Sequence, residues 1–386
     1  MERKAADRKT RAESQGTRVP QRKLAVLFIM LAITTAGCGS SPPEPVNLEE
    51  EPAVSSEDSA PKYEVLADKL QSPWAIDFAG EETIYISERD GAIVKLVNGA
   101  AVRQKLHLLK PVKQVGEGGL LGFALATDFA SSKRAFIYHT YEENGQLYNR
   151  VVAIAENGDG NSWDEEKTLL DQIPGAPVHD GGRLAIGPDG NLYITTGDAQ
   201  RKELAQDKTS LAGKILRMRQ DGTIPKDNPF GESYIYSYGH RNPQGIAWNE
   251  QGELYSSEHG PSGSPGGHDE LNRILPGYNY GWPDVIGDET RQGITPPSYH
   301  TGDDTLAPSG MTANSRGEWL VTGLRGESLL LFTPDLGKQR VLVTSEGRLR
   351  DVKIRGGAIY VITNNTDGRG SPGSRDDRLL RIEPPS

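Results

Sequence analysis

The chain has 386 residues, of which 45 are glycine and 25 are proline, and 25% of all residues are charged. This much glycine and proline favours many turns between short strands over a helical protein. The formal net charge of −10 argues against nucleic acid or an anionic bilayer as the binding surface. The single cysteine rules out an internal disulfide bond.

The first 37 residues have the features of a targeting segment. Residues 2–23 carry eight Lys or Arg against three Asp or Glu, and a weakly polar to apolar run of 13 residues follows at 24–36. That length suits the hydrophobic region of a signal peptide and is too short for a spanning helix. The run ends in small residues before Cys38, which resembles a bacterial lipoprotein signal and implies cleavage before Cys38 and its acylation. The alternative is an ordinary signal peptide with an incidental cysteine.

Residues 38–61 are rich in Pro, Ser and Glu and offer almost nothing to bury. We therefore expect a disordered acidic tether. Removing residues 1–37 removes a net charge of +5, so the remaining chain carries about −15. The expected location is outside the cytoplasm, with the protein anchored to the bacterial cell membrane by its acyl chains.

A recurring unit fills residues 62–386. In each copy, two alternating apolar positions lead through a turn into a strand of pattern apolar-Tyr-apolar-Ser/Thr, which predicts a β-hairpin. The six copies begin at residues 76, 123, 184, 246, 311 and 352. The intervals between them leave room for one four-stranded blade each.

Six such hairpins predict an all-β fold, a six-bladed β-propeller over residues 62–386. One hairpin cannot bury its faces, whereas a closed ring of hairpins buries them and protects the strand edges. We expect residues 63–66 and 379–382 to complete the ring and close it. An open sandwich or two smaller barrels are the alternatives.

Five segments beside these hairpins contain the residues that can carry chemistry. They are GEGGLLGFAL (116–125), HDGGRLAIGPDGNLYITTGD (179–198), GHRNPQGIAW (239–248), SSEHGPSGSPGGHDELNRI (256–274) with YNYGWP (278–283), and GRLRD (347–351). Together they resemble the soluble glucose dehydrogenases that depend on pyrroloquinoline quinone (PQQ) and the related aldose sugar dehydrogenases. The resemblance runs from about residue 72 to residue 382 and implies a six-bladed propeller.

His179 and Asp198 stand at the two ends of the third hairpin, whose pairing should bring them together. An imidazole oriented by a carboxylate is the arrangement that general-base catalysis needs. By resemblance, His179 takes the proton of the anomeric hydroxyl of an aldose while hydride passes to PQQ, and Asp198 fixes the tautomer of His179. The implied product is a lactone, and the implied partner is an external electron acceptor such as a quinone or a cytochrome.

PQQ carries three carboxylates, which arginine binds well because its guanidinium group forms paired hydrogen bonds. The resemblance assigns Arg325, Arg348 and Arg350 to the cofactor, with Arg241 holding the quinone oxygen and Asn242 bonding beside it. Arg348 and Arg350 alternate along a strand and so share one face. Taken alone, that pair could equally be a solvated strand face.

Ca²⁺ prefers oxygen ligands, including backbone carbonyls. By resemblance, the carbonyls of Gly260 and Pro261 hold a Ca²⁺ ion that bridges to PQQ, and Glu270 and Tyr280 contribute to a second, structural ion. Glu117 stands where the glucose enzyme has a Gln that touches the substrate. An ionised carboxylate only accepts hydrogen bonds, so we expect a sugar preference different from that of glucose dehydrogenase.

Two other functions compete with the dehydrogenase. A Ca²⁺-dependent sugar lactonase would hold a central metal with Glu, Asn and Asp side chains and would need no arginine cluster. A non-catalytic propeller would bind a sugar or a protein at the cell surface. The fold alone does not choose among the three, but the arginines favour the dehydrogenase because lactones carry no carboxylates.

Replacing Cys38 by Ser is expected to release the protein from membranes, because the acyl chains supply the membrane affinity and the acidic tether supplies none. Cell fractionation measures this, with the wild-type chain as the control. Unchanged membrane association of the variant would contradict the lipoprotein interpretation.

Overall fold

A computed structural model describes residues 63–263 and 266–383, within a unit that runs from Asp58 to Ser386. The predicted signal peptide, Cys38 and the predicted tether lie outside the described residues. The described part is nearly all β, with only a four-residue α-helix, α1 (Phe129–Ser132), and a four-residue 3-10 helix, η1 (Lys202–Ala205). Among these residues no helix is long and apolar enough to cross a membrane.

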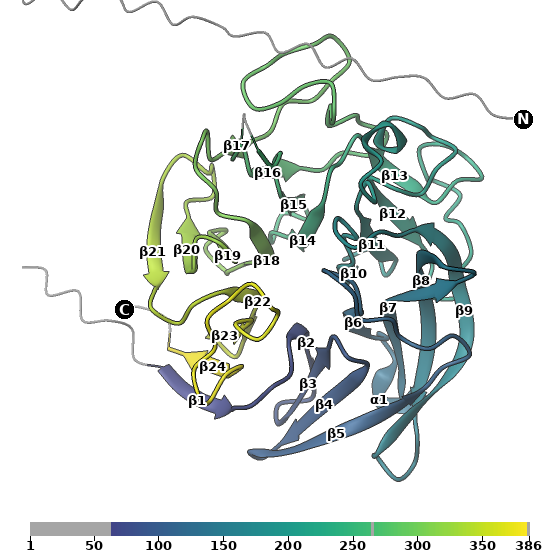
Figure 1. Ribbon diagram of the computed structural model, residues 1–386, viewed down its shortest axis with the longest axis vertical. Coiled ribbons are helices and arrows are strands. Elements are labelled where there is room, and N and C mark those ends of the chain that lie inside the picture. The colour runs from purple at the N-terminus through teal and green to yellow at the C-terminus, as the bar shows by residue number, and fades with distance from the viewer. Residues whose placement is uncertain (1–62, 264–265, 384–386) are drawn as a thin grey trace, which may run out of the picture. The chain divides into compact units, whose positions relative to one another are not determined.

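The described strands form five hydrogen-bonded sheets (Figure 1). Three sheets follow chain order: β10 (Leu184–Ile186), β11 (Leu192–Thr196), β12 (Lys214–Met218) and β13 (Ile235–Tyr238); β14 (Pro243–Trp248), β15 (Leu254–Glu258), β16 (Glu270–Arg273) and β17 (Tyr299–His300); and β18 (Pro308–Ala313), β19 (Trp319–Gly323), β20 (Ser328–Phe332) and β21 (Gln339–Val343). A fourth sheet has the order β1 (Tyr63–Ala67), β24 (Leu379–Ile382), β23 (Ala358–Thr363) and β22 (Leu349–Arg355).

The fifth sheet has eight strands. One half is β2 (Pro73–Ala79), β3 (Thr83–Glu88), β4 (Ala92–Val97) and β5 (Ala100–His107), and the other is β6 (Leu120–Leu125), β7 (Arg134–Glu143), β8 (Gln146–Glu156) and β9 (Ser162–Pro174). The halves join because β5 pairs with β9 in parallel. We expected one sheet per hairpin, and this pairing, which the hairpin pattern does not reveal, reduces the described sheets to five.

All six predicted hairpins are antiparallel pairs: β2 with β3, β6 with β7, β10 with β11, β14 with β15, β18 with β19, and β22 with β23. Their first strands contact one another in a ring, in the order β2, β6, β10, β14, β18, β22 and back to β2 (Figure 1). The start of each first strand lies beside the end of its second strand. Loops from all six hairpins can therefore meet at one end of the ring.

The two ends of the described chain close the ring by pairing. Tyr63 is opposite Ile382 and Val65 is opposite Leu380 in the antiparallel pair of β1 and β24. This confirms the expectation that residues 63–66 and 379–382 complete the ring. Leu379, Leu380 and Ile382 are buried, so the closing strands also contribute to the core.

An aromatic cluster packs the two halves of the eight-stranded sheet together. Trp163 of β9 is fully buried, and its ring centroid lies 5.7 Å from that of Tyr85 on β3 and 5.8 Å from that of Phe123 on β6. Its indole N–H donates a hydrogen bond to Gln104 on β5 at 2.8 Å. The buried ring and its satisfied polar group make Trp163 a central support of this junction.

Replacing Trp163 by Ala is expected to lower the free energy of unfolding by about 3–5 kcal/mol, because it leaves a cavity and orphans the Gln104 carbonyl. The midpoint of urea or thermal unfolding measures this. Leu109→Ala is the matched control, since that side chain is 82% exposed. Equal midpoints for the two variants would show that the cluster is not needed for stability.

Candidate active site

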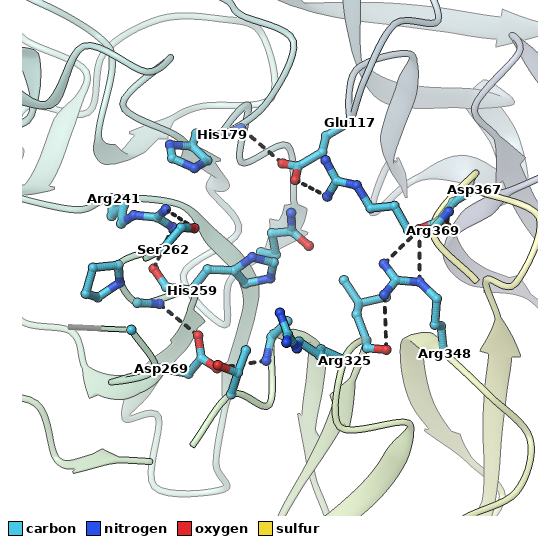
Figure 2. A pocket seen from close by; sticks show the side chains of 18 of the residues that line it. Glu117, His179, Arg241, His259, Ser262, Asp269, Arg325, Arg348, Asp367 and Arg369 are labelled. Carbon is cyan, nitrogen blue, oxygen red and sulfur yellow. Dashed lines mark hydrogen bonds and ion pairs between the residues drawn. The ribbon is translucent and has the colours of Figure 1, made fainter. Parts of the chain in front are cut away.

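A cavity of about 650 Å³ opens at the end of the ring where the hairpin loops meet (Figure 2). Its lining comes from all six hairpins and includes six arginines, Arg89, Arg241, Arg325, Arg348, Arg350 and Arg369. Five acidic residues also line it, Glu117, Asp269, Asp303, Glu327 and Asp367. The cavity therefore suits an anionic ligand whose charges are distributed over several positions.

His179 and Asp198 meet at the cavity wall. The Nδ1 atom of His179 lies 2.9 Å from Oδ1 of Asp198, and the carboxylate is almost fully buried while the imidazole remains 18% exposed. Gly197 permits this approach, because a Cβ atom at that position would lie 1.9 Å from the His179 carbonyl oxygen. The contact makes Nδ1 the protonated nitrogen and leaves Nε2 as the basic one.

Other groups hold the Asp198 carboxylate in place. The indole N–H of Trp282 donates to Oδ2 of Asp198 at 2.9 Å, and the backbone amide of Gln200 donates to Oδ1 of Asp198 at 2.8 Å. The backbone amide of Asp198 donates to the Arg241 carbonyl at 2.8 Å. The orienting carboxylate is thus tied to both the YNYGWP and the GHRNP segments.

Arg241 is 5% exposed and lines the same cavity. Its guanidinium group donates to the Ser262 hydroxyl at 3.0 Å and to the His259 carbonyl at 3.3 Å. Burial lowers the pKa of Arg241, and the carboxylates of Asp198 and Glu258 oppose that effect. Its charge is therefore held in a partly dry environment, where it acts more strongly than in water.

Asn242 is fully buried behind the cavity lining. Its Oδ1 atom accepts a hydrogen bond from the Gly181 amide at 3.0 Å, and its Nδ2 atom has no partner among the described residues. Buried donors are rarely left without a partner. The structure thus leaves an available amide donor behind His179 and Arg241.

The three predicted cofactor arginines differ in environment. Arg348 donates through Nη2 to Asp367 at 2.9 Å, and Arg350 donates through Nη2 to Asn364 at 2.7 Å. Burial lowers the pKa of Arg350 to about 9, against the opposing charge of Asp367. Arg325 is exposed at the cavity rim. The structure brings all three to one cavity, and Arg325 and Arg348 lie across it from His179 (Figure 2).

Glu117 lies beside His179, and both of its carboxylate oxygens are engaged. Oε2 accepts a hydrogen bond from the His179 backbone amide at 3.0 Å, and Oε1 forms an ion pair with Arg369 at 2.5 Å. Burial raises the pKa of Glu117, but His259, the His179 amide and Arg369 lower it to about 2. Glu117 is therefore ionised throughout the neutral range and is a poor general base there.

Gly260, Pro261, Glu270 and Tyr280 line a second, small cavity of about 10 Å³. Gly260 and Pro261 also line the large cavity, as do Arg241 and His259, so these four residues separate the two cavities. Within the described part of the chain, neither the Gly260 nor the Pro261 carbonyl oxygen accepts a hydrogen bond. Burial, followed by the charge of Glu258, raises the pKa of Glu270 to about 8. Free carbonyls and buried carboxylates are suitable partners for a cation.

The described residues contain no cluster of three or more His, Cys, Asp or Glu side chains arranged to hold a metal ion. A metal site in this region would therefore need oxygen ligands of other kinds as well, such as backbone carbonyls or water. Ca²⁺ accepts both of these ligand types readily.

Sequence reasoning missed several residues that shape the cavity. They are Arg89, His259, Asp269, Asp367 and Arg369. Asp269 accepts hydrogen bonds from the amides of Gly260, Leu306 and Ala307 at 2.7 to 2.8 Å and so joins two loops. Arg89 and His259 could have been found, because each directly follows the second strand of a hairpin.

Comparisons with known proteins agree with this geometry. The family model described as Glucose / Sorbosone dehydrogenase matches residues 70–380. Quinoprotein glucose dehydrogenase B of Acinetobacter calcoaceticus is 31% identical over 308 residues, 72% of this chain and 63% of that protein. The chain therefore spans less than two thirds of that relative's length.

Two further proteins are matched over nearly their whole length. Aldose sugar dehydrogenase YliI of Escherichia coli K12 is 31% identical over 357 residues, 83% of this chain and 92% of that protein. The solved PQQ-bound form of an aldose sugar dehydrogenase from Streptomyces coelicolor is 36% identical, covers 84% of this chain and 99% of that one, and has a TM-score of 0.77. The chain thus belongs to the Glucose / Sorbosone dehydrogenase family and is an oxidoreductase.

Proposed function

We propose that the protein oxidises aldose sugars at the anomeric carbon to lactones, with PQQ as cofactor and an external electron acceptor. One observation carries the proposal: a histidine oriented by a buried carboxylate opens onto a cavity with six arginines. The named relatives, a quinoprotein glucose dehydrogenase and two aldose sugar dehydrogenases, support it. A lactonase has no use for this many guanidinium groups.

The cavity fits the cofactor by charge and by size. A volume of about 650 Å³ is within the range of small-molecule sites. Arg325, Arg348 and Arg350 would bind the carboxylates of PQQ, and Asn242 would support the cofactor site from behind its lining, where its side chain is fully buried and accepts from the Gly181 amide. When bound, PQQ supplies the two-electron acceptor that the polypeptide lacks.

The residues of the chain would handle the proton and the developing charge. His179 would accept the proton of the anomeric hydroxyl at Nε2, while Asp198 holds Nδ1–H and stabilises the imidazolium that forms. Arg241 would place a fixed, partly desolvated positive charge where negative charge develops on the quinone oxygen. We further propose that the Gly260 and Pro261 carbonyls hold Ca²⁺ as a Lewis acid, and that Glu270 and Tyr280 hold a second ion.

We also propose that the protein is a six-bladed propeller and that it lies outside the cytoplasm. We count the two halves of the eight-stranded sheet as separate blades, which makes six blades, one for each hairpin of the ring. The targeting features of residues 1–37 and Cys38 support an extracytoplasmic, lipid-anchored protein.

Treatment with EDTA followed by PQQ alone is expected to give no dye reduction with any of a panel of aldoses, and adding Ca²⁺ should restore it. The control is the same protein given Ca²⁺ without PQQ. Full activity with PQQ in metal-free buffer would refute the Ca²⁺ assignment. A failure to bind PQQ at all would favour a non-catalytic sugar-binding protein.

His179→Gln is expected to lower turnover by about 10²–10⁴-fold, because a general base contributes that much, while PQQ still binds to the arginines. The low-pH limb of the rate profile should disappear with the base. Asp198→Asn should lower turnover by about the same factor or by less, because it disturbs only the orientation of the base. Near-normal turnover and pH dependence of His179→Gln would refute the assignment.

A further inference from the structure

We propose that Arg369 is a positioning residue that holds the base His179 in place through Glu117, in addition to the support that Asp198 gives to the imidazole. The contacts between Arg369, Glu117 and His179 come from the structure, and their role in catalysis rests on the proposed function. Glu117 and Arg369 are 252 positions apart in the chain.

The backbone of His179 needs external support. Its φ angle is +66°, in the left-handed region that residues with a side chain rarely adopt. Asp198 holds only the imidazole. The backbone amide is held by the Glu117 carboxylate at 3.0 Å, and the His179 carbonyl accepts from the Ala199 amide at 3.2 Å.

The loop that carries Glu117 is itself fixed against the loop that carries His179. The Glu117 amide donates to the Pro177 carbonyl at 2.7 Å. A Cβ atom at Gly116 would lie 1.8 Å from that same carbonyl oxygen, so only glycine permits the contact. The guanidinium group of Arg89 donates to the Gly118 carbonyl at 2.8 Å. The position of the Glu117 backbone therefore does not depend on Arg369.

The orientation of the Glu117 side chain does depend on Arg369. The Nη1 atom of Arg369 contacts Oε1 at 2.5 Å, which leaves Oε2 directed at the His179 amide. Arg369 in turn is placed by Asp367, which accepts from the Arg369 backbone amide at 2.8 Å and from Arg348. A chain of charged contacts thus runs from the sixth hairpin across the cavity to the base (Figure 2).

Arg369→Gln removes the cation with little risk to folding, because its side chain is 49% exposed. Arg375→Gln is the matched control: its arginine lies in the same segment between β23 and β24, is 63% exposed, and pairs with Asp68, away from the cavity lining. Arg369→Lys keeps the charge and tests rescue, and Glu117→Gln removes the carboxylate that joins Arg369 to the His179 amide.

In the enzyme loaded with PQQ and Ca²⁺, Arg369→Gln should lower kcat about 10- to 100-fold, because a small displacement of a catalytic group lowers the rate by about that factor. PQQ affinity, measured by titration, should stay within about twofold, since other arginines line the cofactor site. Arg369→Lys should recover most of kcat, and Arg375→Gln should match the wild type. An unchanged kcat, or a loss explained by weaker PQQ binding, would overturn the proposal.

A second measurement needs no activity. The chain has seven histidines, so selective ¹⁵N-histidine labelling gives few amide signals, and His179→Gln identifies that of His179. In the PQQ-free protein, Arg369→Gln and Glu117→Gln should both shift this signal, and Arg375→Gln should leave it unchanged. If the shift occurs but no aldose is oxidised even by the wild type, the positioning stands and the proposed function fails. If the signal does not move, the positioning fails whatever the activity.

Discussion

The pairing of β1 with β24 is the interaction on which the rest of the structure depends. It closes the ring by joining residues near the two ends of the described chain, such as Tyr63 and Ile382. Only in a closed ring do the first and sixth hairpins become neighbours, which is how Arg89 and Arg348 come to line the same cavity. Because β1 covers the outer edge of β24 at this seam, β24 is not left open to pairing with other chains. The site is therefore a property of the closed ring and of no single hairpin.

Within that ring, the cavity concentrates like charges that would repel one another in a dry site. Burial lowers the pKa of Arg350 to about 9 and also lowers that of Arg241, which expresses the free-energy cost of keeping guanidinium groups away from water. Asp367 offsets part of this cost by accepting from Arg348 at 2.9 Å. An anionic ligand would offset more, so the bound state is expected to be the electrostatically satisfied one. Between the third and sixth hairpins, the buried ion pair of Arg183 and Asp351 shows the same compensation of charge between two side chains.

The sequence predicts local relations well and distant ones poorly. Each hairpin is visible as an alternation of apolar residues about a turn, and the contact between His179 and Asp198 follows directly from the pairing of β10 and β11. The parallel pairing of β5 with β9 cannot be predicted in this way, because the sequence of an edge strand does not indicate which other strand it pairs with. The same limit applies to the pair of Glu117 and Arg369, since an ion pair across 252 positions depends on ring closure and leaves no local signal.

The strained backbone of His179 shows why such distant contacts matter. A non-glycine residue keeps a left-handed backbone conformation only where several surrounding contacts hold it there. In His179 the backbone amide, the backbone carbonyl and the imidazole each have a hydrogen-bond partner. Two of these partners, Asp198 and Ala199, come from the same hairpin as His179, and Asp198 is anchored in turn by Trp282 and Arg241. Glu117 belongs to a different hairpin and is tied to a third by Arg369. This contact holds the backbone of the base, while Trp282 and Arg241 hold Asp198 and so its imidazole, and together they fix the base relative to a ligand bound by the arginines.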